Sequence, residues 1–288
     1  MPLFSRGTGS KNIVLANGEK SKHFTFKTNN MNTSRTLIYD GSFNGFLTAV
    51  FTGFEQKLSQ VEIQRKSQSQ NGLFTETETI FTNVEKAKRV WNGIRSRSNN
   101  AIKNIYFAFL SEQKGIEPLL YHYIQKVMKS DKNKESDFSD DCILKIGQLA
   151  HKVGREKHRM EAFVRFQLTK DEVYFANIEP DFDVLPLISK HFRSRYADQQ
   201  WIIYDVKRNY GLFYNLQGVE LISLDLKDVH NNGILKSNVF TNTEHDYQEL
   251  WNNYFQSTNI KSRINKKLHI QHVPKRYWKY LSEKKEAV

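Results

Sequence analysis

The sequence is poor in cysteine, the residue that forms disulfides and binds metals in most metal–sulfur centres. Cys142 is the single cysteine among 288 residues. A disulfide needs two cysteines, and a structural zinc or iron–sulfur site needs several clustered ligands, so this chain alone builds neither a disulfide framework nor an all-cysteine metal site. We therefore expect a reducing compartment, and we expect Cys142 to pack as a small apolar side chain and not to act as a nucleophile.

Long apolar runs are also missing. No stretch approaches the roughly 18 apolar residues that a membrane-spanning helix requires, because Lys, Glu or Asn interrupts each candidate. Residues 1–30 lack the apolar region of a signal peptide. We expect a cytoplasmic protein without a membrane partner.

Acidic residues are too few to balance the basic ones. Lys and Arg number 43 against 31 Asp and Glu, which gives a net charge of +12 and a pI near 9.5. Such an excess favours a polyanionic partner over a neutral or acidic small molecule. The aromatic content of 13% supplies both core bulk and rings on which bases could stack.

Residues 1–34 are rich in Gly, Ser, Asn, Thr and Lys and show no period, so they predict a flexible N-terminal extension. A strand is predicted at 35–40, followed by a helix that Ser42 caps. Helical spacing then dominates as far as residue 160, apart from an alternating run at 74–81 that is typical of an edge strand.

From Phe163 onwards the apolar period changes from helical spacing to two. Strand-like runs recur at 163–168, 173–178, 201–206, 212–214 and 219–224. Short strands and tight turns favour an antiparallel or mixed sheet over a doubly wound parallel one. The predicted fold class is α+β, with a central sheet built from about 163–225 and helices from about 42–160 packed on it. A C-terminal helix and basic segment at about 246–282 complete a single folded unit at 35–282.

The predicted helix before this sheet carries a row of cationic side chains. Ile143, Ile146, Ala150 and Val153 mark its core-facing side. On another side, steps of four and seven residues bring His151, Arg155 and His158 within about 60° of one another. Such a row can bind an anion such as a phosphate. The alternative is an ordinary solvated helix face with two bystander histidines.

Five blocks of the sequence carry a family resemblance. They are Tyr39–Phe51, the stretch from Gly154 to Phe166, Ile178–Pro186, Trp201–Asp205 and Pro274–Leu281. Together, over about residues 35–282, they resemble one uncharacterised bacterial family of probable DNA-metabolism or putative DNA-repair proteins. The resemblance implies pairing with a radical S-adenosylmethionine (radical-SAM) protein that carries a helix-hairpin-helix, and in some relatives fusion to a uracil-DNA glycosylase. It supplies no catalytic residues.

The net positive charge and the family resemblance both favour a DNA-binding accessory protein in repair or modification. A radical-SAM partner would supply the iron–sulfur cluster that this chain lacks. The predicted nucleic-acid-binding residues are His151, Arg155, His158, Arg159, Arg165, Lys266, Lys267, Lys275, Arg276, Tyr277 and Trp278. The cations would contact phosphates, and Tyr277 and Trp278 would stack on an unpaired base. Alternatively, these rings and Tyr280 pin the C-terminus to the domain.

A magnesium-dependent nuclease is the second candidate. Asp181, and after a gap Asp205 and Lys207, follow the order of a signature in which two carboxylates bind Mg²⁺ and a lysine steadies the attacking water. The predicted helix between them departs from the usual adjacent strands of that signature. Otherwise Asp181 caps this helix and Asp205 pairs with Arg208 or Lys207. His269 and His272 lack further zinc ligands, so we expect no cofactor in this chain unless Mg²⁺ binds here.

Overall fold

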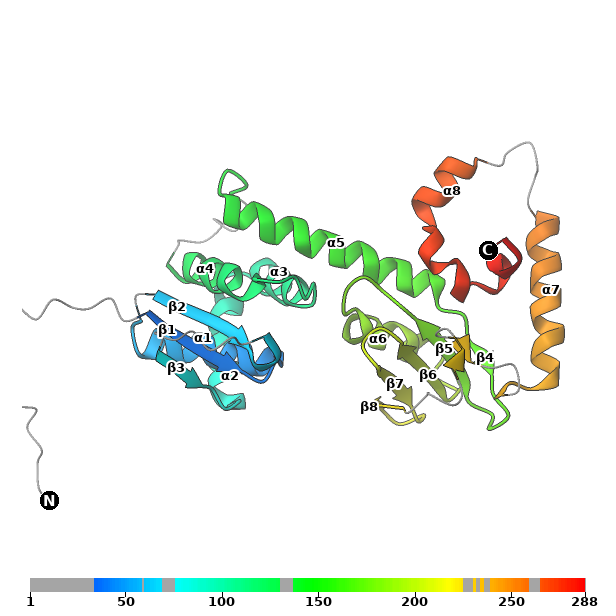
Figure 1. Ribbon diagram of the computed structural model, residues 1–288, viewed down its shortest axis with the longest axis horizontal. Helices are drawn as coiled ribbons and strands as arrows, with labels where there is room; N and C mark the ends of the chain where they lie inside the picture. Colours follow the sequence, from blue (N-terminus) through cyan, green and yellow to red (C-terminus); the bar gives the residue numbers. More distant parts are fainter. Residues whose placement is uncertain are drawn as a thin grey trace, which may run out of the picture.

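The computed structural model describes residues 34–58, 60–68, 76–129, 137–224, 230–231, 234–235, 239–258 and 265–287. Outside these ranges lie the predicted extension at 1–34, except for Ser34, and most of the charged run at 129–141, which the sequence predicts to be a surface loop before the long helix α5 (Asp141–Phe163). Two lobes stand side by side, and the long helix α5 reaches from one to the other (Figure 1).

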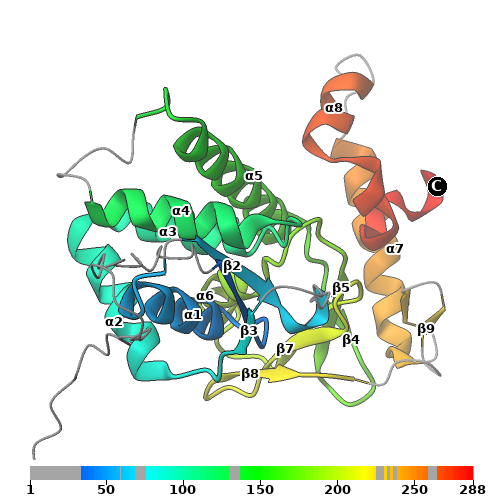
Figure 2. The ribbon, with the colours of Figure 1, turned by 60° about the vertical axis from the view of Figure 1, so that its left-hand side comes forward.

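The N-terminal lobe, residues 34–129, combines a parallel sheet with helices. Its strands are β1 (Ser34–Tyr39), β2 (Gln60–Arg65) and β3 (Glu76–Thr79), and its helices are α1 (Phe43–Glu55), α2 (Val84–Arg97), α3 (Asn99–Phe109) and α4 (Ile116–Lys129). Within the described residues β1 lies between β2 and β3 and pairs with both in parallel. Helices α3 and α4 lie between this sheet and α5 (Figures 1 and 2).

The first strand–helix junction shows how local sequence starts the fold. Gly41 has a φ of +92°, which suits glycine, and the Ser42 hydroxyl accepts a hydrogen bond from the Gly45 backbone N–H at 2.9 Å. A Cβ on Gly45 would lie 2.2 Å from Asp40 Oδ1. The capping residue was predicted, and the confirmed cap begins α1 where the periodicity placed it.

The C-terminal lobe, residues 167–287, contains a mixed sheet. Its elements are β4 (Gln167–Leu168), β5 (Tyr174–Ile178), α6 (Leu185–Arg195), β6 (Trp201–Asp205), β7 (Tyr210–Tyr214), β8 (Val219–Ile222), the short pair β9 (His230–Asn231) and β10 (Ile234–Leu235), α7 (Asn242–Thr258), α8 (Lys266–His272) and the 3-10 helices η5 (Lys275–Tyr280) and η6 (Ser282–Ala287). Strands β4 to β8 lie in sequence order, and only the β5–β6 pair, which α6 connects, is parallel.

Helix α5 (Asp141–Phe163) links the lobes. The Asp140 carboxylate caps it by accepting from the backbone N–H groups of Cys142 and Ile143 at 2.9 and 3.3 Å. Its apolar side, which includes Ile146 and Val153 at 0% exposure, belongs to one continuous cluster of buried residues drawn from both lobes.

The α+β class is confirmed, and so is the mixed character of the sheet in the C-terminal lobe. The prediction that the helices at 42–160 pack on that sheet is wrong for α1 and α4, because these contact the parallel sheet of their own lobe. Strand β2 escaped sequence analysis because Gln, Glu and Arg alternate with only two aliphatic residues along it. Among the described residues, none of the helices combines the length and apolar character that crossing a membrane requires.

A buried ion pair in the N-terminal lobe yields a stability prediction. Arg65 Nε lies 2.6 Å from Glu117 Oε1, and their side chains are 14% and 5% exposed. Glu117→Gln would leave the Arg65 charge buried without its counter-ion, so we expect the free energy of unfolding to fall by about 3–5 kcal/mol. Glu85→Gln, which breaks the exposed Glu85–Lys88 pair, should cost less than about 1 kcal/mol. Denaturant unfolding followed by circular dichroism measures both; equal losses would contradict the assignment.

Candidate functional site

The outer side of α5 carries mostly positive charge, and its described acidic neighbours are Asp141 in the first turn and Glu161, which lies 4.0 Å from His158. Its exposed basic residues are Lys145, His151, Lys152, Arg155 and His158. Glu156 is the sole acidic residue in the sequence from Cys142 to Met160, and it is 1% exposed. The structure therefore presents His151, Arg155 and His158 to solvent, on the face of the helix that the periodicity predicted.

Buried Glu156 holds the C-terminal segment against α5. Its carboxylate accepts hydrogen bonds from the Tyr277 hydroxyl and from the Asp181 backbone N–H, the latter at 2.9 Å. Arg159 and Arg276 lie 3.4 and 3.6 Å from the same carboxylate. One buried anion is thus shared among four donors, which offsets the cost of removing it from water.

The prediction that Tyr277 stacks on a nucleic-acid base is wrong for this conformation. Tyr277 is 1% exposed, and its ring packs against Phe163 with centroids 5.5 Å apart. Burial and the Glu156 carboxylate raise the pKa of the Tyr277 hydroxyl. The alternative, that this ring pins the C-terminus to the domain, is the one that the contacts bear out.

Other predicted contact residues divide into paired and exposed ones. Arg276 binds Asp181 at 2.6 Å and Arg165 binds Glu283 at 2.8 Å. Trp278 is half-buried and donates its indole N–H to the Val273 carbonyl at 3.0 Å.

The remaining predicted cations lie in α8 and at the start of η5. Lys267 and Lys275 are exposed. Lys266 belongs to α8, and its side chain lies outside the described residues. The exposed pair therefore remains available as predicted contact residues.

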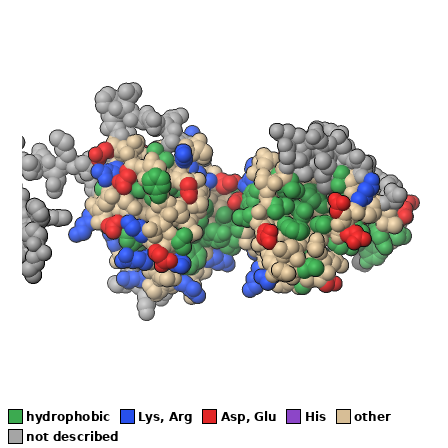
Figure 3. All heavy atoms as spheres, turned by 90° about the horizontal axis from the view of Figure 1, so that it is seen from below, with side chains coloured by type: hydrophobic (Ala, Val, Ile, Leu, Met, Phe, Trp, Pro, Cys, Tyr) green, Lys and Arg blue, Asp and Glu red, His purple; other side chains and the backbone are tan. Residues whose placement is uncertain are grey.

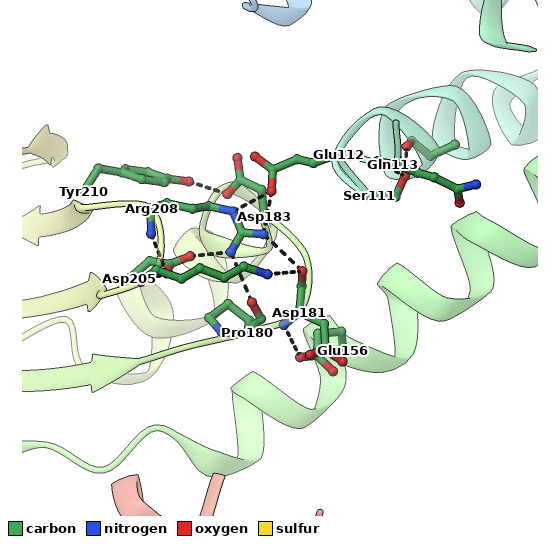
Figure 4. Close-up of polar contacts among 12 residues, drawn as sticks. Ser111, Glu112, Gln113, Glu156, Pro180, Asp181, Asp183, Asp205, Arg208 and Tyr210 are labelled. Atoms are coloured by element: carbon green, nitrogen blue, oxygen red, sulfur yellow. Dashed lines mark hydrogen bonds and ion pairs between the residues drawn. The ribbon is translucent and has the colours of Figure 1, made fainter. Parts of the chain in front are cut away.

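A second polar cluster surrounds Arg208, between the lobes (Figure 4). The guanidinium binds Asp205 Oδ2 at 2.8 Å and Glu112 Oε2 at 2.6 Å. It also donates to the backbone carbonyls of Pro180 and Asp181, each at 3.2 Å. Arg208 thus ties the loop after α3 to the ends of β5 and β6, and the predicted pairing of Asp205 with Arg208 is confirmed.

The residues of the nuclease hypothesis lie close to this cluster. Lys207 Nζ donates to the Asp181 carbonyl at 3.1 Å, while the Asp181 carboxylate binds Arg276. Asp205 is fully buried, and its Oδ1 accepts from the backbone N–H groups of Lys207 and Arg208. Each carboxylate therefore already has an arginine partner.

The structure also bears on the predictions for Asp181 and Cys142. Asp181 does not cap α6, because Val184 occupies that position. Within the described ranges, His, Cys, Asp and Glu form no cluster of three or more that could hold a metal ion. Cys142 is buried, its thiol lies 3.6 Å from the Leu119 carbonyl, and burial raises its pKa, which agrees with the predicted packing role.

A cavity of about 1050 Å³ lies where α5 ends, and sequence analysis missed it. Its walls come from the end of α5, from β4, β5, β6, α6 and α7, and from the C-terminal 3-10 helices. Trp201, fully buried in the core, forms part of the lining. The only available signal was aromatic density, because residues this far apart in sequence converge only through the tertiary fold.

The pairing of η5 with the sheet should depend on pH. Glu179 accepts from Lys279 Nζ at 2.5 Å and from the Tyr280 hydroxyl at 2.7 Å. These hydrogen bonds, that of Lys279 foremost, hold the pKa of Glu179 below its usual value despite partial burial. Because the folded pKa is depressed, the stabilisation is present above the ordinary value of about 4.3 and is lost as pH falls through the folded pKa.

We therefore expect Glu179→Gln to lower the free energy of unfolding at pH 7 and to have a much smaller effect near pH 3. Denaturant titrations of both proteins at the two pH values measure the difference. Glu172→Gln, in the exposed turn between β4 and β5, provides the control. A Glu179→Gln effect that stayed constant between the two pH values would contradict the ion pair.

The family comparison covers the part of the chain in which these sites lie. The model of a domain of unknown function, DUF4130, matches residues 114–283. The match includes α5, the mixed sheet and every residue that lines the cavity, whereas Glu112 and most of the N-terminal lobe precede it. No curated protein matches the sequence. Since the match extends over more than half of the chain, this protein belongs to the DUF4130 family.

Proposed function

We propose that this chain is a cytoplasmic DNA-binding accessory protein in repair or modification, and that the DNA backbone runs along the exposed face of α5. The observation that carries the proposal is the exposed row of Lys145, Lys152 and Arg155 with His151 and His158, beside which Glu161 lies 4.0 Å from His158. A helix of 23 residues extends about 35 Å. That length faces several consecutive phosphates, so affinity arises from many small electrostatic contacts.

Burial of Glu156 supports this surface. An exposed carboxylate at that position would repel phosphate, but Tyr277, Arg159 and Arg276 bind it inside the protein. Arg155 is left exposed beside it, and a guanidinium suits bidentate contact with phosphate. The C-terminal cations that form internal ion pairs contribute less than the sequence alone indicated.

The chemistry would belong to a partner, for which we propose a radical-SAM protein. The chain has one cysteine, and that cysteine is buried, so an iron–sulfur cluster would have to come from another protein. The resemblance to DNA-repair-like proteins supports this division of labour. In this proposal the present chain holds the DNA while its partner modifies it.

The assigned surface makes a salt-dependent prediction. Lys152→Glu with Arg155→Glu should weaken binding to a short fluorescent duplex by at least about tenfold at moderate salt. The slope of log K against log salt should become shallower by about 2, because roughly one unit is lost with each phosphate contact. Fluorescence anisotropy across a salt series measures both quantities.

A matched control exists on α2. Lys88 and Arg95 are also exposed on a helix, and Lys and Arg side chains gather on the side of the N-terminal lobe seen in Figure 3. Lys88→Glu with Arg95→Glu makes the same change in charge and should leave most of the affinity intact. Equal losses in both variants would show that net charge alone determines binding, and loss only in the α2 variant would overturn the α5 surface.

The same proteins test the nuclease alternative. Plasmid and single-stranded DNA are incubated with Mg²⁺, with Asp205→Asn as the comparison. Cleavage that disappears in this variant, provided that the variant remains folded, would replace the accessory role by catalysis at Asp181, Asp205 and Lys207.

A further inference from the structure

We infer that the cavity at the end of α5 receives a single nucleobase displaced from DNA, an inference that rests on the proposed function. Helix α5 ends at the cavity, because Glu161 and Ala162 from its last turns line it, as does Arg165 just beyond the helix. DNA held along α5 would therefore pass its mouth. A base that leaves the stack at that point needs a site with planar walls and a polar edge.

Aromatic side chains from several elements line the cavity. Phe166, Phe192 and Tyr196 pack around Trp201, with ring centroids 5.3 to 6.2 Å apart. Tyr247 and Trp251 contribute further rings from α7. Tyr247 is 66% exposed although it is a large aromatic residue. A planar base that stacks on the exposed ring of Tyr247 would gain stacking energy regardless of its identity.

Polar groups suited to a base edge also line the cavity. They include the amide side chains of Gln167, Asn177, Gln199 and Gln248. Amides donate and accept hydrogen bonds in the patterns that base edges present.

The charges at the cavity also favour an anionic ligand attached to the base. Arg195 is exposed and lines the cavity. Lys279 also lines it but is paired with Glu179, and both acidic groups in the lining are engaged as well. Glu161 binds Lys157 at 2.6 Å, and Glu244 accepts from the Leu168 backbone N–H at 3.0 Å. The volume of about 1050 Å³ leaves room for the sugar and phosphate of the displaced nucleotide.

The inference predicts a preference for unpaired bases, because displacing a base costs least where it is not paired. Three probes are compared by anisotropy: a fully paired duplex, the same duplex with one bulged thymine, and single-stranded DNA. Wild-type protein should bind the bulged duplex more tightly than the paired one. Tyr247→Ala should reduce binding of the bulged and single-stranded probes by about tenfold, a loss typical of one lost base–aromatic stack, and leave the paired duplex unaffected.

Tyr254→Ala is the matched control, since Tyr254 lies on the same helix, is 60% exposed and does not line the cavity. Replacement of the bulged thymine by 5-iodouracil should give photo-cross-links to Tyr247 or Trp251.

The outcomes separate this inference from the proposed function. Equal binding of all three probes, unchanged by Tyr247→Ala but weakened by Lys152→Glu with Arg155→Glu, would overturn the base-binding cavity and leave the α5 surface standing. Cross-links confined to residues outside the cavity would overturn the cavity as well. Absence of binding to any probe at low salt would overturn the proposed function itself.

Discussion

The guanidinium of Arg208 ties the two lobes together by ion pairs, alongside the apolar cluster that both lobes share. It joins Glu112, from the loop after α3, to Asp205 at the end of β6. Both partners are anionic, and Asp205 is fully buried, so an apolar side chain at position 208 would leave a charge without compensation. The planar fork of arginine also reaches two backbone carbonyls at once, which the single ammonium of lysine does not reproduce.

Glu156 has the corresponding role between α5 and the C-terminal segment. A carboxylate inside a strongly basic helix would ordinarily neutralise that surface. Here it faces inward, where Tyr277 and Arg276 bind it. Glu156 therefore fixes the position of η5. Because its carboxylate points inward, it also leaves the exposed face of α5 positive.

Sequence patterns predicted most elements, because those elements are long and strongly periodic. The cap at Ser42, the helix that contains Ile146 and Val153, and the strand at Trp201 all follow from local rules. Strand β2 was missed because its burial depends on pairing with β1, which local alternation does not encode. For the same reason the sequence predicted cations near residue 276 but did not show that Arg276 and Arg165 are paired with acidic residues far along the chain.

The position of the family match has a consequence for protein engineering. A fragment trimmed to residues 114–283 would lose α3, which packs along α5, and would also lose Glu112, a counter-ion of Arg208. The apolar flank of α5, with Ile146 and Val153 at its centre, would then meet water along much of its length. The family match is therefore shorter than the part of the chain whose residues pack together in one core.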